Sequence, residues 1–239
     1  MLQLPLGVRL RDASRFENFI TAANAPAVHA VRGIVTAGAS TVLWLWGARG
    51  SGRSHLLQAA CASAGAYGRP SAYLPLAELA GLGSGVLAGL ESLGIVAIDD
   101  VDGVAGMADW ERALFNLYNA AADGNASLIV AAAAPPAGIR WRLGDLASRF
   151  SAAIVFHLRA LDDRDLPAAL QQRAALRGLE LPVDSAEFLL KRYPRDMHTL
   201  CAVLDTLDEA SLVAQRRLTV PFLKEVLEDR RWVTGDAAR

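Results

Sequence analysis

The sequence predicts an α/β protein in which a five-stranded parallel sheet is followed by a small all-α domain. An apolar run at residues 41–46 leads through a glycine-rich turn into a helical pattern, and a second apolar run at 94–99 ends in two adjacent acids. Beyond about residue 160 the periodicity is helical throughout. The remaining strands are expected in three short β-rich runs, at 72–76, 127–134 and 152–158.

Composition narrows the class of protein. A chain of 239 residues with 53% hydrophobic and 21% charged residues can bury a substantial core, which argues against disorder. The formal net charge of −1 provides no overall attraction to nucleic acid, so we expect any DNA contact to be local or through a partner. The two cysteines fit reduced thiols, the first residues lack a secretory signal, and no apolar run reaches the length of a membrane span. We therefore expect a cytoplasmic protein with no membrane partner.

The stretch from 41 to 58 predicts a phosphate-binding loop. Its centre, G-A-R-G-S-G-R-S at residues 47–54, lies between the expected strand and helix. Glycines let the backbone curl so that successive N–H groups converge, and the helix N-terminus adds partial positive charge. Ser54 would supply a hydroxyl to Mg²⁺. Arg53 replaces the usual lysine; in the alternative, an ordinary glycine-rich turn, it would be a solvated cation at an unfavourable end of the helix dipole.

Asp99 and Asp100 end the apolar run at 94–99, at the edge where ligands bind in open parallel sheets. Asp99 is placed for the Mg²⁺ shell and Asp100 for orienting an attacking water, whereas the alternative is an acidic surface turn. The next strand ends in four alanines, Ala131–Ala134, where an ATPase of this plan usually has a polar sensor for the γ-phosphate. We therefore expect hydrolysis by this chain alone to be weak or absent.

Four side chains outside the loop have two interpretations each. Phe16 and Phe19, three residues apart, can stack on a base or plug the domain, and the pattern alone favours the plug. Arg149, in D-L-A-S-R-F, is either surface charge or an arginine finger that reaches a neighbouring subunit's nucleotide. Arg195, near the start of a helix, can fold over phosphates or remain solvated. Arginine alone is weak evidence here, because lysine is rare in the chain.

The N-terminal tetrapeptide Gln3-Leu4-Pro5-Leu6 precedes any foldable pattern, and an extended peptide of this kind can dock in a pocket on a partner. We expect a flexible docking peptide at 1–10, the α/β domain at 11–160, the helical domain at 161–232 and a disordered tail at 233–239. Helices are expected at 27–35, 78–90 (loose and interrupted by glycines), 109–122, 145–150, 162–177, 182–192, 196–215 and 220–230.

Five segments together resemble the Hda family of AAA+ regulators, which are relatives of the bacterial replication initiator DnaA. In order, they are G-A-R-G-S-G-R-S-H-L-L, I-D-D, D-L-A-S-R-F, L-R-G-L-E-L-P and A-Q-R-R-L-T-V-P-F-L-K-E. The resemblance spans essentially the whole chain and includes the arginine at position 53. It implies an AAA+ core followed by a small helical lid.

The resemblance also implies roles for residues. Asp99-Asp100 is similar to Walker B, Arg149 to the arginine finger and Arg195 to sensor II; Phe16 and Phe19 correspond to the adenine-side segment. The loop is similar to Walker A. The full set of candidate nucleotide-binding residues is Phe16, Phe19, Gly47, Ala48, Arg49, Gly50, Ser51, Gly52, Arg53, Ser54, His55 and Arg195.

The function that the resemblance implies is negative regulation of chromosomal replication initiation. Such proteins bind ADP or ATP, act while ADP-bound, and stimulate ATP hydrolysis by DnaA on the DNA-loaded sliding clamp. Gln3-Leu4-Pro5-Leu6 would be the clamp-docking peptide, so DNA is contacted only through the clamp. Ser54 and Asp99 would hold Mg²⁺ where the metal is present, and a homo-oligomer is compatible with the family.

Three other functions remain open. A stand-alone NTPase or nucleotide kinase predicts turnover without partners, and Ala131–Ala134 count against it. The initiator itself would need an added helix-turn-helix domain, which we do not expect because the sequence ends soon after Lys224-Glu225. A helicase-loading adaptor would share the fold but would not need the N-terminal peptide at 3–6.

Overall fold

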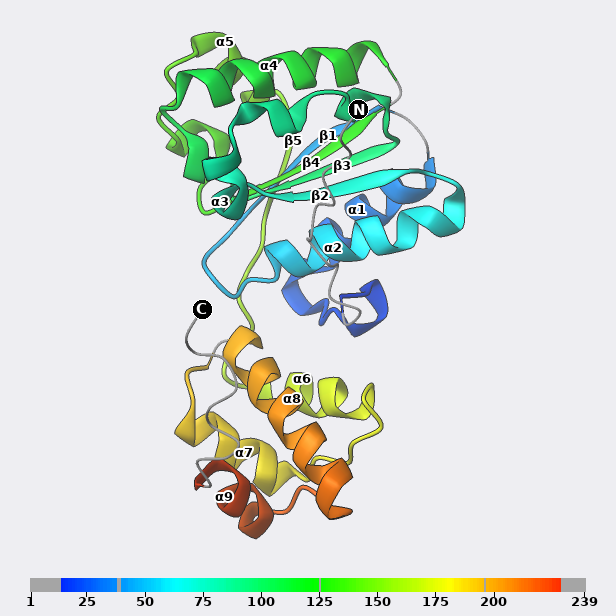
Figure 1. The fold of residues 1–239 in the computed structure, drawn as a ribbon, viewed down its shortest axis with the longest axis vertical. Coiled ribbons are helices and arrows are strands. Elements are labelled where there is room, and N and C mark those ends of the chain that lie inside the picture. Colours follow the sequence, from blue (N-terminus) through cyan, green and yellow to red (C-terminus); the bar gives the residue numbers. More distant parts are fainter. Residues whose placement is uncertain (1–13, 38–39, 125, 196, 229–239) are drawn as a thin grey trace. The chain divides into compact units, whose positions relative to one another are not determined.

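The structure is a computed structural model that describes residues 14–37, 40–124, 126–195 and 197–228 (Figure 1). The candidate clamp-docking peptide at 3–6 and the expected C-terminal tail lie outside these residues. The chain divides into two compact units, Met1–Ala160 and Leu161–Arg239. Each unit has its own hydrophobic core, so each is described by itself.

The first unit is built on a sheet of five parallel strands in the order β2-β3-β4-β1-β5, which confirms the predicted fold class. The central strands β1, β3 and β4 are buried, as expected for continuous apolar runs in a parallel sheet. Because all strands run the same way, the chain leaves β1 and β3 at the same edge. The strands are β1 (Val42–Trp46), β2 (Ser71–Pro75), β3 (Ile95–Asp99), β4 (Ser127–Ala132) and β5 (Ile154–His157).

Two pairs of helices cover the sheet, one on each face (Figure 1). Leu43 and Leu45 of β1 pack towards α1 and α2, whereas Trp44 between them packs towards α4 and α5. This alternation follows from the two-residue period of a strand. The helices are α1 (Ala25–Ala37), α2 (Arg53–Ala64), α4 (Ala108–Asp123) and α5 (Gly144–Ser151).

The helix predicted at 78–90 is wrong. The structure has one short helix, α3 (Leu76–Leu79), followed by three 3₁₀ turns at Ala80–Leu82, Ser84–Leu87 and Leu90–Ser92. Gly83 and Gly89 have φ angles of 84° and 83°, a left-handed conformation that a continuous right-handed helix cannot accommodate. Repeated glycines therefore convert the expected helix into separate turns.

The second unit is a bundle of four helices around a leucine-rich core. Leu170, Leu189, Leu200, Leu204 and Leu207 are fully buried in it. No helix in the described part of the chain has the length and apolarity that a membrane span requires. The helices are α6 (Leu166–Ala175), α7 (Val183–Arg192), α8 (Met197–Ala214) and α9 (Val220–Glu228).

Candidate nucleotide-binding site

The loop after β1 curls tightly before α2 begins. Gly50 and Gly52 adopt φ angles of 82° and 95°, which side-chain-bearing residues rarely tolerate. The Ser51 N–H donates a hydrogen bond to the carbonyl of Ala48 at 3.1 Å, which closes a turn within the loop. The sequence therefore has glycine at positions where this curled backbone requires it.

Two glycines are also required because of what lies against them. A Cβ at Gly47 would collide with the carbonyl oxygen of Leu158, and one at Gly52 would lie 2.6 Å from the ring of Phe19. Neither contact leaves room for a methyl group. The loop is thus held between the chain leaving β5 and the aromatic segment before α1.

The first turn of α2 presents backbone donors towards the loop. The Leu56 N–H donates to the carbonyl of Gly52 at 2.9 Å, which closes the first turn of the helix. The N–H groups that precede Leu56, those of Arg53 and Ser54 among them, lie at the end of a helix where no earlier turn supplies acceptors. Together with the helix dipole they favour an anion at this position.

Two buried polar atoms of the loop lack partners. Ser51 Oγ and Arg53 Nη1 are buried and have no hydrogen-bond partner among the described residues. Buried polar groups are nearly always paired in folded proteins, so a ligand that pairs both atoms would suit this loop. A phosphate group has acceptor oxygens for both and for backbone N–H groups at the start of α2. The residues of this loop therefore fit a phosphorylated ligand.

Arg53 is ion-paired with the second acid of β3. Its Nη2 lies 3.2 Å from Oδ1 of Asp100, and its side chain is only 13% exposed. Asp100 has a φ of 48°, a left-handed conformation that aspartate tolerates better than most residues. Desolvation, followed by the negative charge of Asp99, raises the pKa of Asp100, and the Arg53 guanidinium opposes this shift. Sequence reasoning placed Arg53 and Asp100 at one site but did not predict their contact.

Asp99 is buried beneath a tyrosine that sequence reasoning missed. Its exposed fraction is 1%, its Oδ2 accepts a hydrogen bond from the Tyr73 hydroxyl at 2.8 Å, and its Oδ1 accepts one from the Asp100 N–H at 3.0 Å. Burial, reinforced by the charge of Asp99, raises the pKa of Tyr73, so its hydroxyl keeps its proton. Hydrogen bonding with Gln58 and Ser54 of α2 acts on the same hydroxyl. The signal in the sequence was a polar aromatic residue inside the neighbouring strand at 72–76.

The expected metal ligands, Ser54 and Asp99, are both near the Tyr73 hydroxyl, but their surroundings do not suit Mg²⁺. This ion keeps several water ligands in an octahedral shell, and a carboxylate that is 1% exposed offers almost no surface to water. No group of three or more His, Cys, Asp or Glu side chains in the described residues could hold a metal. Phosphate therefore fits this site, whereas a hydrated divalent ion does not.

The end of β4 carries no polar side chain. Ala131 and Ala132 are fully buried, and the indole N–H of the buried Trp44 donates to the carbonyl of Ala134 at 3.1 Å. The Ala133 N–H donates to Asp102 Oδ1 at 3.3 Å. Small residues are needed here because the Trp44 indole reaches past this strand end. The position expected for a γ-phosphate sensor is therefore occupied by methyl groups and backbone.

Phe16 and Phe19 are buried against α2, as the plug interpretation expects. Phe19 meets the His55 ring edge-on at 5.4 Å between centroids, and the Arg32 guanidinium lies 4.9 Å from the centre of the Phe16 ring. The two rings join the aromatic segment before α1 to the first turn of α2. Their predicted role beside an adenine stays a prediction.

The two remaining candidate arginines have different surroundings. Arg149 on α5 is exposed, forms no ion pair within the described parts of the chain, and lies 5.8 Å from the centre of the Tyr118 ring. Within the second unit, Arg195 precedes α8 and is ion-paired with Asp163. The predicted roles of Arg149 and Arg195 stay predictions.

Glu111 is a second residue that sequence reasoning missed. It is fully buried on α4, and its carboxylate accepts hydrogen bonds from the N–H groups of Gly106 at 2.7 Å, Arg142 at 3.1 Å and Leu143 at 2.7 Å. The last two belong to the loop that leads into α5. Glu111 therefore fixes the start of the helix that carries Arg149. Glu111 lies three residues before the core residue Leu114, which places both on the same face of the helix, and this spacing was the signal available in the sequence.

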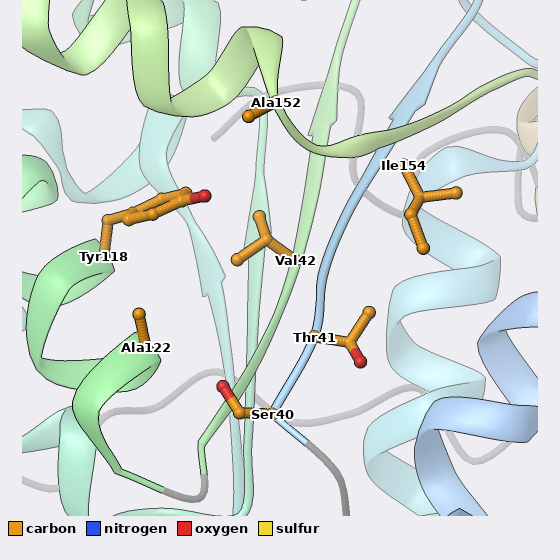
Figure 2. Close-up of a pocket in the computed structure, with 7 residues that line it drawn as sticks. All are labelled: Ser40, Thr41, Val42, Tyr118, Ala122, Ala152 and Ile154. Carbon is orange, nitrogen blue, oxygen red and sulfur yellow. The ribbon is translucent and has the colours of Figure 1, made fainter.

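The first unit also has an open hollow that is separate from the phosphate loop. It lies at the beginnings of β1 and β5, where Val42 lies between Tyr118 of α4 and Ile154 of β5 (Figure 2). None of its lining side chains carries a charge at neutral pH. This hollow therefore lacks the positive charge that a phosphate ligand requires.

The parallel sheet with its curled glycine loop after β1, the acids at the end of β3 and the helical second unit have the architecture of an AAA+ P-loop core with its lid. Residues 162–227 match the family model of the Hda lid domain. The match concerns the second unit.

Solved structures agree with this fold. Domain III of the replication initiation protein DnaA from Thermotoga maritima has a TM-score of 0.74 and 19% identity, and the match covers 95% of this chain and 100% of that one. AMPPCP-bound DnaA from Aquifex aeolicus has a TM-score of 0.69 and 22% identity, with 82% and 65% covered. The Thermotoga maritima RuvB Holliday junction branch migration motor has a TM-score of 0.65 and 18% identity, with 92% and 72% covered. At these identities the likeness concerns the fold.

Proposed function

We propose that this protein is a negative regulator of replication initiation that binds an adenine nucleotide, docks on the DNA-loaded sliding clamp and stimulates ATP hydrolysis by the initiator DnaA. The observation that carries the proposal is the contrast between two arginines. Arg53 is held inside the chain's own phosphate loop by Asp100, whereas Arg149 is exposed and without an ion pair in the described residues. One arginine serves the bound nucleotide and the other serves a partner.

The nucleotide, ADP in the working state, acts as a structural ligand. Residues 47–55 hold its phosphates, Phe16 and Phe19 lie on the adenine side, and Arg195 contributes from the lid. The curled loop, its two unpartnered buried atoms and the N-terminus of α2 behind it support phosphate binding. A ligand that binds only the folded state stabilises it by mass action.

Arg149 acts in trans as an arginine finger. Its guanidinium would approach the ATP held by the initiator and stabilise the charge that develops on the transferring phosphoryl group. A finger of this kind is a rigid part of its own domain. Glu111 supports this role, because it accepts hydrogen bonds from the N–H groups of Arg142 and Leu143 and so fixes the loop in front of α5.

The N-terminal peptide Gln3-Leu4-Pro5-Leu6 docks on the clamp. Tethering to a clamp raises the effective concentration of the regulator near the initiator without new contacts between the two proteins. DNA is then contacted only through the clamp, which agrees with the chain's net charge of −1.

A stand-alone ATPase is the second candidate, and the presence of both Asp99 and Asp100 favours it. Two features oppose it: Asp100 is engaged by Arg53, and the end of β4 offers only alanines near the expected γ-phosphate position. Turnover of ATP by the purified protein without partners separates the two candidates.

The experiment is single-turnover hydrolysis of labelled ATP preloaded on the cognate initiator. Four mixtures are compared: initiator alone, with this protein, with this protein and DNA-loaded clamp, and with clamp and a version lacking residues 1–7. Hydrolysis that rises only in the third mixture supports the proposal. An equal rise in the fourth contradicts the docking role, and no rise with folded, nucleotide-loaded protein contradicts the regulator function.

A further inference from the structure

We propose that the site binds its nucleotide without a divalent metal, because the Arg53 guanidinium bridges Asp100 and the phosphates while the Tyr73 hydroxyl covers Asp99. The inference rests on the proposed nucleotide-binding function and adds the metal content of the site. It concerns this chain's own residues and needs no partner protein.

Arg53 provides the positive charge at the centre of the site. One guanidinium nitrogen, Nη2, is bonded to Asp100, and the other, Nη1, is buried without a partner in the described residues. A planar guanidinium presents several donors in a fixed fork, so it can hold a carboxylate with one nitrogen and a phosphate oxygen with the other. A lysine ammonium has a single nitrogen and cannot span both groups in this way. Arg53 is thus a bridge between Asp100 and the ligand.

The Tyr73 hydroxyl covers the carboxylate of Asp99, the residue that would otherwise be a metal ligand. Its hydroxyl donates to Asp99 Oδ2 at 2.8 Å, while the Asp100 N–H occupies Asp99 Oδ1 at 3.0 Å. With both oxygens engaged and 1% of the residue exposed, a hydrated ion reaches Asp99 only if the tyrosine moves. The hydroxyl comes from the neighbouring strand β2, where Tyr73 is fixed by the sheet register.

The test is equilibrium binding of fluorescent ADP to the full chain, with Mg²⁺ and with EDTA. We expect the dissociation constant to change by less than about threefold between the two buffers. In Tyr73→Phe the Oδ2 of Asp99 is released, so Mg²⁺ should now strengthen ADP binding by about tenfold or more. Tyr67→Phe, a matched change at an exposed tyrosine of the same unit, should behave as the unaltered protein.

Each outcome has a distinct meaning. An unaltered protein that binds ADP about tenfold or more tightly with Mg²⁺ overturns the inference and leaves the proposed function intact. No ADP binding in either buffer overturns both. A folded Tyr73→Phe that stays indifferent to Mg²⁺ overturns the role of the hydroxyl, with circular dichroism as the check of folding. The comparison of buffers in the unaltered protein does not depend on any variant.

Discussion

Two arginines of the first unit, Arg53 and Arg149, differ in almost every physical respect. Arg53 lies at the start of α2, is largely buried and is paired with Asp100 at 3.2 Å. Arg149 lies near the end of α5, is exposed, and has a tyrosine ring as its neighbour at 5.8 Å. A buried and paired arginine cannot leave its site without exposing an uncompensated carboxylate, whereas an exposed one can reach a partner at little cost.

The two arginines therefore differ in what they can contact. Arg53 is enclosed by residues of its own chain, whereas Arg149 is accessible to a partner. The Arg53 side of the sheet is closed by internal contacts, including Tyr73 over Asp99 and Phe19 against the loop. On the other face of the sheet, α5 is held by its buried Leu146 and Phe150 and by the hydrogen bonds from Glu111 to the loop before it. The Arg149 guanidinium forms no ion pair in the described residues. The proposed function calls for this asymmetry, because the chain would retain its own nucleotide through Arg53 and act on a partner's nucleotide through Arg149.

Replacing Arg149 should have the largest effect. We expect Arg149→Ala to lower partner-stimulated ATP hydrolysis by about 10³-fold or more, because an arginine finger supplies rate factors of this order. Single-turnover hydrolysis by the initiator, with clamp present, measures the effect. Arg112→Ala, at an exposed arginine on α4, is the control and should leave the rate unchanged. Similar losses in both variants would mean that general surface charge, not a finger, is involved.

Replacing Arg53 should weaken nucleotide binding by about 10- to 100-fold, since hydrogen bonds to charged groups contribute about 1.5–3 kcal/mol. Arg53→Ala also leaves Asp100 without its partner. Titration with fluorescent ADP measures the loss. Arg53→Lys keeps the charge but cannot bridge Asp100 and the phosphate. Its affinity for ADP should lie between those of Arg53→Ala and the unaltered protein. If Arg53→Ala binds ADP as tightly as the unaltered protein, the bridging role is wrong.

Replacing Glu111 should mainly affect stability and the positioning of Arg149. Glu111→Gln substitutes an amide donor for one of the oxygens that accept the three N–H groups, so we expect the free energy of unfolding to fall by about 1–3 kcal/mol. Urea unfolding followed by circular dichroism measures it. The exposed Glu91→Gln is the matched control, expected within about 0.5 kcal/mol of the unaltered protein. Equal stabilities would show that the carboxylate does not hold the loop before α5.

Cys61 should report the integrity of α2, the helix that begins with Arg53. Burial raises the pKa of its thiol to about 12, so almost no thiolate exists at pH 8 and alkylation should modify the half-buried Cys201 first. The pKa of the Cys61 thiol in the folded protein lies above the ordinary value of 9.0. The stability that comes from burying the neutral thiol is therefore fully present below pH 9.0 and is lost as the pH rises towards 12. Mass spectrometry of labelled peptides and unfolding at two pH values measure both effects. Early labelling of Cys61 would contradict a closed α2.

Local patterns in the sequence were sufficient for the strand order along the chain, the glycine loop and the helical lid. The apolar runs, the glycines at 47–52 and the spacing of leucines in the lid are properties of neighbouring residues, and each depends on backbone geometry that acts over a few residues. The wrong helix at 78–90 also follows from local backbone geometry. We expected one helix with weak points at its glycines, whereas the positive φ angles of Gly83 and Gly89 divide the segment into separate turns.

The sequence by itself determined an α/β core with a phosphate loop after its first strand, two acids after its third and a separate helical lid. Only the tertiary structure decided that Arg53 pairs with Asp100, that Tyr73 covers Asp99 and that Glu111 holds the loop before Arg149. In all three cases the contact joins residues that are 26 or more positions apart in the sequence. Such pairs form because the parallel sheet brings separate strand ends to one edge, and no local pattern encodes which side chains then meet.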